Sequence, residues 1–178
     1  MQNRERVVRE LRARVRDVPD FPQKGILFRD ITPLLQDPGS FRACIDLFVD
    51  HFRDRHIDVF AGIESRGFLF AAPVALALGA GFAPVRKAGK LPAATVRRSY
   101  ALEYGEASIE MHRDAVRPGQ RVALVDDLLA TGGTAAAACD LLDELGAQIA
   151  DVAFLIELEF LAGRQRLRGR EITSFIRY

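Results

Sequence analysis

The clearest chemistry lies in residues 122–134, VALVDDLLATGGT, where an apolar run ends in two carboxylates and continues into a Thr-Gly-Gly-Thr sequence. Glycines let backbone N–H groups approach an anion closely, and threonine hydroxyls add donors. The alanine-rich stretch that follows predicts a helix, whose N-terminus also favours negative charge. We therefore predict that a phosphate group binds to Ala130, Thr131, Gly132, Gly133 and Thr134.

Asp126 and Asp127 precede this phosphate loop and have the wrong sign to attract the phosphate itself. Paired carboxylates are suited to hydroxyl groups or to a cation. A ribose with free 2- and 3-hydroxyls that carries a 5-phosphate would satisfy both parts of the segment. The sequence thus predicts a sugar-phosphate site, and the alternative interpretation is an ordinary strand, turn and helix.

Other phosphate and catalytic motifs do not fit. The sequence has no G-x-x-x-x-G-K-[ST], and Gly79-Ala80-Gly81 lacks the third glycine of a dinucleotide fingerprint. Residues 62–67, GIESRG, have the spacing G-x-x-S-x-G and not the G-x-S-x-G of a serine hydrolase. The three histidines are too scattered for a zinc site. These observations count against kinase, dehydrogenase, hydrolase and zinc-enzyme functions.

Short apolar runs rich in β-branched and aromatic residues must position these groups. They are IDVFAGI (57–63), GFAPVRK (81–87), QRVALVDDL (120–128) and IADVAFLIEL (149–158). Helical stretches at 73–81 and 134–147 alternate with them. This alternation predicts an α/β fold with a mostly parallel sheet, and such sheets bind ligands at the carboxyl ends of their strands.

The remaining segments flank this core. Apolar residues from Val7 to Val18 recur at helical spacing and predict an amphipathic helix that ends near Pro19. A second helix is predicted at about 40–55, with Ser40 as its N-cap. Residues 91–115 predict two extended arms joined by a loop, a candidate lid. We expect one domain, residues 1–178.

Composition limits the partners and the cellular environment. With 25 Lys and Arg against 24 Asp and Glu, the net charge is +1, which provides no global attraction for nucleic acid or a membrane surface. Cys44 and Cys139 show no metal or redox spacing and are predicted to be buried thiols. No apolar run approaches the roughly 20 residues of a membrane span. A soluble, cytoplasmic protein is expected.

The phosphate-loop segment resembles the phosphoribosyl pyrophosphate signature of the type I phosphoribosyltransferases. Further segments resemble the adenine phosphoribosyltransferases, in order and across nearly the whole chain: FRDITPLL, DPGSFRA, GIESRGFLFA, VRKAGKLP, SYALEYG, VDDLLATGGT and IELEFLAGRQRL. The resemblance implies a twisted, mostly parallel sheet flanked by helices, with a flexible hood over the active site. It also implies transfer of 5-phosphoribosyl from phosphoribosyl pyrophosphate to adenine, giving AMP and pyrophosphate in purine salvage.

The same resemblance implies roles for residues outside the phosphate loop. Residues implied to meet pyrophosphate are Ser65, Arg66, Arg86, Lys87 and Lys90. Residues implied to bind adenine are Leu27, Phe28, Arg29 and Leu158. Residues 1–35 are implied to form an N-terminal helix and the base-binding hood segment. Hydrophobic pattern alone does not distinguish Phe28 from a core aromatic, and a solvated basic loop is the alternative for the cations.

The resemblance places the catalytic loop within 91–115. Glu103 would act near the base with Arg66 as a second catalytic residue, and Tyr100 and Tyr104 would belong to the same loop. A carboxylate in a closed, dry site can accept the N9 proton of a purine or stabilise the charged base. Magnesium is implied as the cofactor, carried by the substrate and water and not bound directly by the protein, and a homodimer is implied as the assembly.

Two rival functions remain. One is a phosphoribosyltransferase for another base, such as orotate, xanthine or hypoxanthine. The other is a regulatory protein that senses phosphoribosyl pyrophosphate and binds nucleic acid, although the chain has no evident basic face. Neither nucleic acid nor a membrane is expected as a partner.

Overall fold

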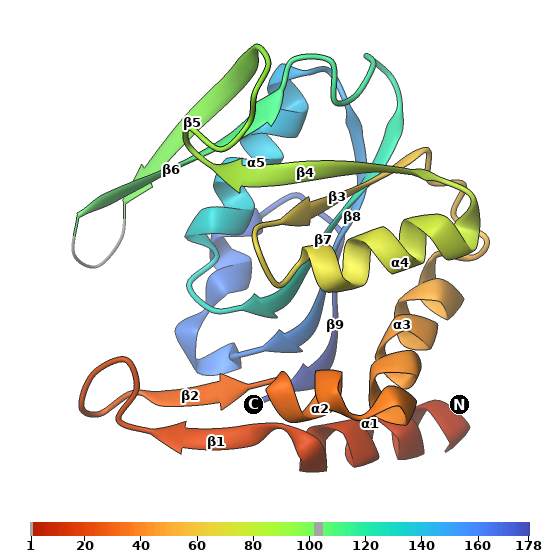
Figure 1. Ribbon diagram of the computed structural model, residues 1–178, viewed down its shortest axis with the longest axis vertical. Coiled ribbons are helices and arrows are strands. Elements are labelled where there is room, and N and C mark those ends of the chain that lie inside the picture. The colour runs from red at the N-terminus through yellow and green to blue at the C-terminus, as the bar shows by residue number, and fades with distance from the viewer. Residues whose placement is uncertain (1, 102–104) are drawn as a thin grey trace. The chain divides into compact units, whose positions relative to one another are not determined.

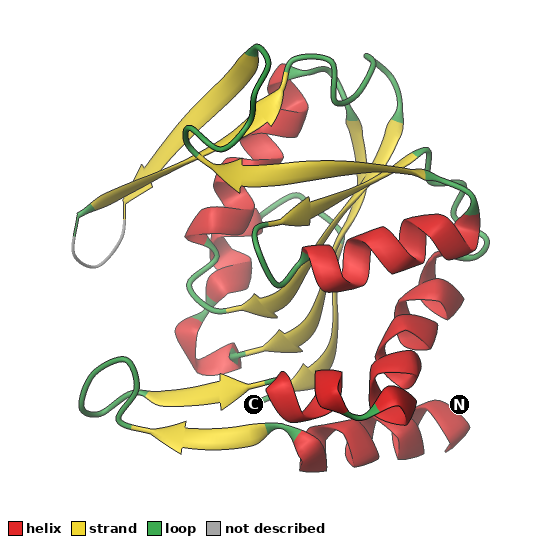
Figure 2. Cartoon of the chain, in the orientation of Figure 1, coloured by secondary structure: helices red, strands yellow, loops and turns green. Residues whose placement is uncertain are grey.

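The computed structural model describes residues 2–101 and 105–178 (Figure 1). Its contacts divide the chain into two compact units, residues 1–50 and 51–178. The secondary structure of both is shown in Figure 2. None of the helices in the described residues combines the length and apolar character needed to cross a membrane.

The first unit consists of helices and one β-hairpin. Its elements in order are α1 (Gln2–Arg14), β1 (Arg16–Pro19), β2 (Leu27–Asp30), α2 (Thr32–Gln36) and the start of α3 (Pro38–Phe52). The predicted N-terminal helix was too long, because Val18 lies in β1 and pairs with Phe28 of the antiparallel strand β2. Pro19 disfavours a helical conformation at Val18, which explains this difference.

The second helix begins two residues earlier than predicted and has a different cap. The Asp37 carboxylate accepts hydrogen bonds from the backbone N–H (2.8 Å) and the hydroxyl (2.6 Å) of Ser40. Pro38 occupies the first helical position, where its missing N–H leaves no hydrogen bond unmade. Asp37 is therefore the N-cap, and the predicted cap Ser40 is a donor to it.

The second unit is built on one seven-stranded sheet with the order β5-β6-β4-β3-β7-β8-β9. The strands are β3 (Val59–Ile63), β4 (Gly81–Lys87), β5 (Thr95–Ala101), β6 (Glu106–His112), β7 (Arg121–Leu129), β8 (Gln148–Glu157) and β9 (Ile172–Arg177). Strands β4, β3, β7, β8 and β9 pair in parallel, whereas β5 and β6 are antiparallel. The mostly parallel sheet and the two extended arms are confirmed, and β9 was not predicted.

Two longer helices connect the parallel strands. Helix α4 (Phe68–Leu78) leads from β3 to β4, and α5 (Gly133–Glu144) leads from β7 to β8, so the chain moves outward in opposite directions from the central pair β3 and β7. Right-handed crossovers in opposite directions place their helices on opposite faces of the sheet. Between β3 and β7 the strand order therefore reverses, which is where open α/β sheets form a ligand-binding crevice.

Helix α4 starts five residues before the predicted position. The expected first residue, Pro73, lies inside the helix, which continues past it although proline has no backbone N–H to donate. Gly79 ends it in the left-handed conformation at φ 68° and donates its N–H to the carbonyl oxygens of Ala75 and Leu76. The predicted helix at 73–81 is thus shifted toward the N-terminus.

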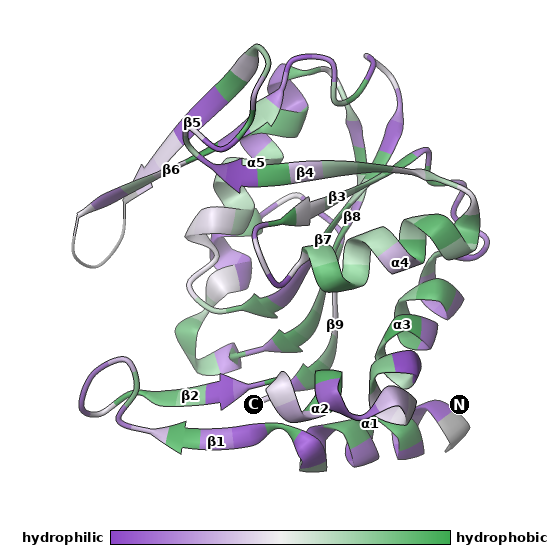
Figure 3. Cartoon of the chain, in the orientation of Figure 1, coloured by the Kyte–Doolittle hydropathy of each residue, from purple (hydrophilic) through white to green (hydrophobic). Residues whose placement is uncertain are grey.

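Buried apolar side chains hold the central strands in place. Phe60, Leu124 and Phe154 of β3, β7 and β8 are all at most 1% exposed. Figure 3 shows the hydrophobic colour along these central strands. A buried side chain of this size contributes roughly 1.5–3 kcal/mol, so the sheet gives the strand ends a rigid base.

Candidate active site

Two acidic side chains lie at the carboxyl end of β7, beside the end of β3, at the point where the strand order reverses. The backbone N–H of Asp127 donates to Oδ1 of Asp126 at 2.9 Å. Arg66, in the turn after β3, places its Nε 2.9 Å from Oδ2 of Asp127. The structure thus brings together the two predicted ribose ligands and one predicted pyrophosphate ligand.

Burial changes the ionisation of this acidic pair. Desolvation raises the pKa of Asp126 well above its usual value, and the neighbouring Asp127 raises it further. Desolvation also raises the pKa of Asp127, but the Arg66 guanidinium opposes this rise. The charge of Arg66 therefore favours ionisation of Asp127, which makes Asp127 the stronger acceptor for a ligand hydroxyl.

The predicted phosphate loop connects β7 to α5 and lines a small cavity. The cavity has a volume of about 90 Å³, and its lining comprises Asp126 and residues 128–135. Helix α5 begins at Gly133 with no side-chain hydrogen bond to its first turn. Its first N–H groups lack partners within the helix and carry the positive end of the helix dipole. The arrangement can bind an anion the size of a phosphate.

Close backbone contacts require glycine at two positions of this site. A Cβ on Gly132, whose φ is 81°, would lie 2.4 Å from the carbonyl oxygen of Gly163. A Cβ on Gly67 would lie 2.6 Å from the carbonyl oxygen of Ile63 and 2.8 Å from Oδ1 of Asp126. These approaches leave no room for a side chain.

Three of the four predicted pyrophosphate cations, Arg86, Lys87 and Lys90, lie at the end of β4 and in the turn that follows. Oε2 of Glu64 accepts from Nε of Arg86 at 3.0 Å and from the backbone N–H of Lys87 at 3.1 Å. Arg86 also donates to the carbonyl oxygen of Lys90 at 3.0 Å. Within residues 2–101 and 105–178, the exposed ammonium groups of Lys87 and Lys90 make no salt bridge. The Arg86 guanidinium is thus already hydrogen-bonded to Glu64 and Lys90, whereas the ammonium groups of both lysines are exposed to solvent and can bind an anion.

Strand β5 contacts the predicted phosphate loop through Tyr100. The Thr134 hydroxyl donates to the Tyr100 hydroxyl at 3.0 Å. The predicted catalytic residue Glu103 and its neighbour Tyr104 lie outside the described residues. Ser65 is exposed in the turn before Arg66.

The predicted adenine ligands lie in different units. Leu158, 7% exposed, follows β8, and its N–H donates to the carbonyl oxygen of Leu129 at 2.9 Å, which places it beside the phosphate loop. Leu27, Phe28 and Arg29 form β2 of the first unit, where Phe28 packs edge-to-face on Phe21 with ring centroids 5.1 Å apart. Of the four predicted adenine residues, only Leu158 therefore lies in the same unit as the predicted sugar-phosphate residues, residues 51–178.

Sequence reasoning gave no role to two carboxylates beside the basic turn. Glu64 lies inside the GIESRG motif and directly follows a predicted strand, a position that could have indicated a role in the site. Glu110 of β6 is 1% exposed, between the buried residues Ile109 and Met111. Because three consecutive residues are buried, the usual alternation along a strand gives no sign of its special position.

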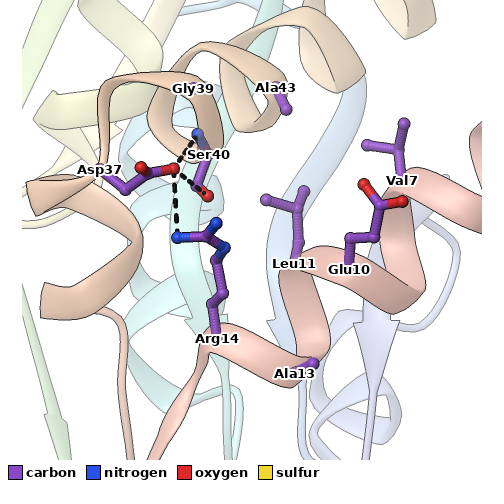
Figure 4. Close-up of a pocket in the computed structure, with 9 residues that line it drawn as sticks. All are labelled: Val7, Glu10, Leu11, Ala13, Arg14, Asp37, Gly39, Ser40 and Ala43. Atoms are coloured by element: carbon purple, nitrogen blue, oxygen red, sulfur yellow. Dashed lines mark hydrogen bonds and ion pairs between the residues drawn. The ribbon is translucent and has the colours of Figure 1, made fainter.

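A larger cavity, of about 460 Å³, lies within the first unit (Figure 4). It is lined by Val7, Glu10, Leu11, Ala13, Arg14, Asp37, Gly39, Ser40 and Ala43. Its polar groups are already engaged: Nη1 of Arg14 lies 3.3 Å from Asp37, which caps α3. This groove contains none of the predicted ligands and results from the packing of α1 beside α3.

No group of three or more His, Cys, Asp and Glu side chains in the described parts of the chain is arranged to hold a metal ion. Cys44 and Cys139 are free and buried, as predicted, and burial raises the pKa of each thiol to about 12.

Comparison with known proteins agrees with this fold and site. A family model described as the phosphoribosyl transferase domain matches residues 30–172. An adenine phosphoribosyltransferase from Anaeromyxobacter dehalogenans is 56% identical over 168 residues, covering 94% of this chain and 98% of the relative. The chain therefore belongs to the adenine phosphoribosyltransferase family, and the predicted resemblance and fold class are confirmed.

Two solved structures share the fold closely. The crystal structure of adenine phosphoribosyltransferase from Thermoanaerobacter pseudethanolicus has a TM-score of 0.93 and 50% identity, covering 96% of this chain and 99% of that one. The enzyme from Saccharomyces cerevisiae, complexed with an imino-altritol bisphosphate and adenine, has a TM-score of 0.92 and 43% identity, with 96% and 99% coverage.

Proposed function

We propose that this chain transfers the 5-phosphoribosyl group of phosphoribosyl pyrophosphate to adenine, giving AMP and pyrophosphate. The observation that carries the proposal is the carboxylate pair Asp126 and Asp127 directly before a phosphate loop at the reversal of strand order. Relatives at 53–56% identity named adenine phosphoribosyltransferase support the choice of base.

The ribose 5-phosphate would be held at two ends. The phosphate loop would bind the 5-phosphate through the backbone N–H groups at the start of α5. Asp127, with its Arg66 partner, would accept hydrogen bonds from the 2- and 3-hydroxyls together with Asp126. This double attachment would hold C1 of the ribose at a fixed place between the base and the leaving group.

The leaving pyrophosphate would face the basic turn. Arg66, Lys87 and Lys90 would stabilise the negative charge that develops as the bond from C1 to oxygen breaks. Ser65 would contribute a hydroxyl and Arg86 would shape the turn through its bonds to Glu64 and Lys90.

We further propose that the reaction requires Mg²⁺. The residues beside the sugar-phosphate site offer carboxylate oxygens, Asp126 and Asp127, which are the hard donors that this ion prefers. When bound through pyrophosphate oxygens and water, it would neutralise part of the leaving-group charge. The chain would contribute Asp126 and Asp127 through the ribose hydroxyls and water, without a direct ligand set.

Leu158 would contribute to adenine binding, as would Leu27, Phe28 and Arg29, with Phe28 stacking on the purine ring. Attack of N9 on C1 requires removal of the N9 proton, for which Glu103 is the proposed acceptor. Tyr100 and Tyr104 would belong to the loop that excludes water during this step.

We propose that the chain works as a single catalytic domain and as a homodimer in the cytoplasm. Helix α4 is apolar on all sides, yet Leu76 on it is 84% exposed, which favours a covered face. The buried free thiols Cys44 and Cys139 are typical of a reducing compartment.

The test is a turnover assay with phosphoribosyl pyrophosphate and Mg²⁺ in which adenine, hypoxanthine, guanine, xanthine and orotate are offered separately. Adenine-specific formation of nucleotide and pyrophosphate supports the proposal. We expect Glu103→Ala to lose turnover and to retain binding of phosphoribosyl pyrophosphate. Turnover with another base would overturn the adenine assignment, and tight binding without turnover of any base would favour the regulatory alternative.

A further inference from the structure

A buried carboxylate organises the basic turn after β4. Oε1 of Glu110 accepts hydrogen bonds from the backbone N–H groups of Lys90 at 3.0 Å and Leu91 at 3.1 Å. The backbone N–H of Gly89 also interacts with this carboxylate. Successive backbone N–H groups that converge in this way form an anion-binding concavity. Here the chain fills it with its own side chain, which fixes the conformation of the turn.

The same carboxylate also binds the hairpin formed by β5 and β6. Oε2 of Glu110 accepts from Nη2 of Arg97 on β5 at 3.1 Å. In the sheet register Glu110 lies opposite Arg97 on one side and opposite Arg86 on the other. Figure 1 shows the three strands side by side. Glu110 therefore connects the basic turn to the hairpin that carries the proposed catalytic loop.

Its environment keeps this group ionised although it is almost inaccessible to water. Burial raises the pKa of Glu110, but the hydrogen bonds from the turn and from Arg97 outweigh this effect and leave the pKa below its ordinary value. A buried anion that is held mainly by backbone N–H groups loses its stabilisation if the turn changes shape. The turn and the carboxylate are thus mutually dependent.

The conformation of this turn determines the positions of two cations, Lys90 and Arg86. Lys90 lies within it, and the carbonyl oxygen of Lys90 accepts from Arg86. A change in the turn would therefore move the Lys90 ammonium group and release one bond of the Arg86 guanidinium. Leu158 lies away from this turn, because it follows β8, which β3 and β7 separate from β4 in the sheet order.

We propose that Glu110 is a positioning residue for the pyrophosphate end of the substrate: it holds the turn 88–91 and joins it to the β5–β6 hairpin. The inference rests on the proposed function, because it takes phosphoribosyl pyrophosphate as the ligand of the turn. It predicts that Glu110 affects the binding of phosphoribosyl pyrophosphate and free pyrophosphate, and not the binding of adenine.

The experiment compares KM for phosphoribosyl pyrophosphate, KM for adenine and inhibition by pyrophosphate in four variants. Glu110→Ala is expected to raise KM for phosphoribosyl pyrophosphate about tenfold or more, the change expected for one lost charge-assisted contact. The pyrophosphate inhibition constant rises in parallel, and KM for adenine stays within about twofold of wild type. Glu110→Gln retains an oxygen acceptor for the turn and is expected to recover part of the affinity.

Two further variants separate positioning from general loosening of the hairpin. Arg97→Gln removes only the bond to the hairpin, so a smaller rise in the same KM is expected. Glu144→Gln is the matched control, because it breaks the exposed pair (2.8 Å) that joins Arg98 of the same hairpin to Glu144 at the end of α5, without touching the turn. It should leave both KM values unchanged, since exposed pairs contribute little.

The outcomes are distinguishable. Absence of turnover in wild type defeats the proposed function. Normal wild-type turnover with an equal rise of both KM values in Glu110→Ala, or with no rise in either, overturns the positioning role. If Glu110→Ala does not fold, Glu110→Gln and Arg97→Gln decide the question by the same selective rise for phosphoribosyl pyrophosphate.

Discussion

Replacement of Gly132 by alanine tests the phosphate loop most directly. Gly132 has φ 81°, and a Cβ there would lie 2.4 Å from the carbonyl oxygen of Gly163. Two separate costs follow: the left-handed backbone becomes unfavourable, and two backbone segments must move apart. Because the atoms that the Cβ would meet are all backbone atoms of Gly163, the loop itself has to shift.

The magnitudes differ between the two costs. The left-handed conformation costs an alanine roughly 1–2 kcal/mol, which lowers Tm by roughly 2–8 °C for a chain of this size. Displacement of the loop also misaligns the N–H groups that face the phosphate. Each hydrogen bond to a charged group is worth about 1.5–3 kcal/mol, so the loss of one raises KM for phosphoribosyl pyrophosphate about tenfold to a hundredfold.

Gly119→Ala is the matched control. Gly119 has φ 83°, nearly the same conformation, but a Cβ on it would meet no atom within 4 Å. Steady-state kinetics and thermal unfolding of both variants therefore separate backbone strain from the close contact. Gly119→Ala should lose stability only, whereas Gly132→Ala should also lose affinity. Equal KM values in both variants would refute the assignment of residues 130–134 as a phosphate loop.

Three further predictions follow from named contacts. Asp127→Asn should lower kcat/KM about a hundredfold, because it removes a charged acceptor and leaves the Arg66 guanidinium without it; full activity would contradict the ribose-holding role. The Thr32 hydroxyl, followed by other hydrogen bonds and Arg16, lowers the pKa of Asp30 to about 2, so this carboxylate stabilises the fold above about pH 4 and the stabilisation is lost as the pH falls toward 2. Asp30→Asn should therefore cost about 1–2 kcal/mol at neutral pH, with the difference from wild type in chemical unfolding shrinking as the pH falls and vanishing only below about pH 2; a constant difference would contradict this cause. Leu76→Glu should dissociate the proposed homodimer in sedimentation experiments, and an unchanged mass would exclude α4 from the interface.

Features coded by neighbouring residues could be predicted from the sequence. The acidic pair, the glycines and the helix start follow one another within residues 126–135, so local chemistry was sufficient to predict a sugar-phosphate site. The central strands were equally accessible, because strands buried on both faces form continuous apolar runs. The order of strand and helix then indicated the parallel sheet.

Features that depend on distant partners could not be predicted in this way. Val18 matches helical spacing, and only its pairing with Phe28 reveals a strand. Strand β9 (Ile172–Arg177) has a mixed burial pattern, and its place beside β8 is set by the sheet. The role of Glu110 depends on a turn 20 residues earlier in the chain, at Lys90. A contact of this kind leaves no periodic signal.

The charge pattern is consistent with the proposed binding of an anionic substrate by a nearly neutral chain. The guanidinium groups beside the site each face a carboxylate: Arg66 faces Asp127, and Arg86 faces Glu64. The ammonium groups of Lys87 and Lys90, by contrast, make no salt bridge within the described residues. Because charges beyond about 8–10 Å are screened at physiological salt, local cations such as these would govern the attraction of the proposed anionic substrate more than the net charge of +1. The arginines thus face carboxylates, and the charge of Lys87 is shared in part with Glu64, whereas no carboxylate forms a salt bridge with Lys90 within the described residues.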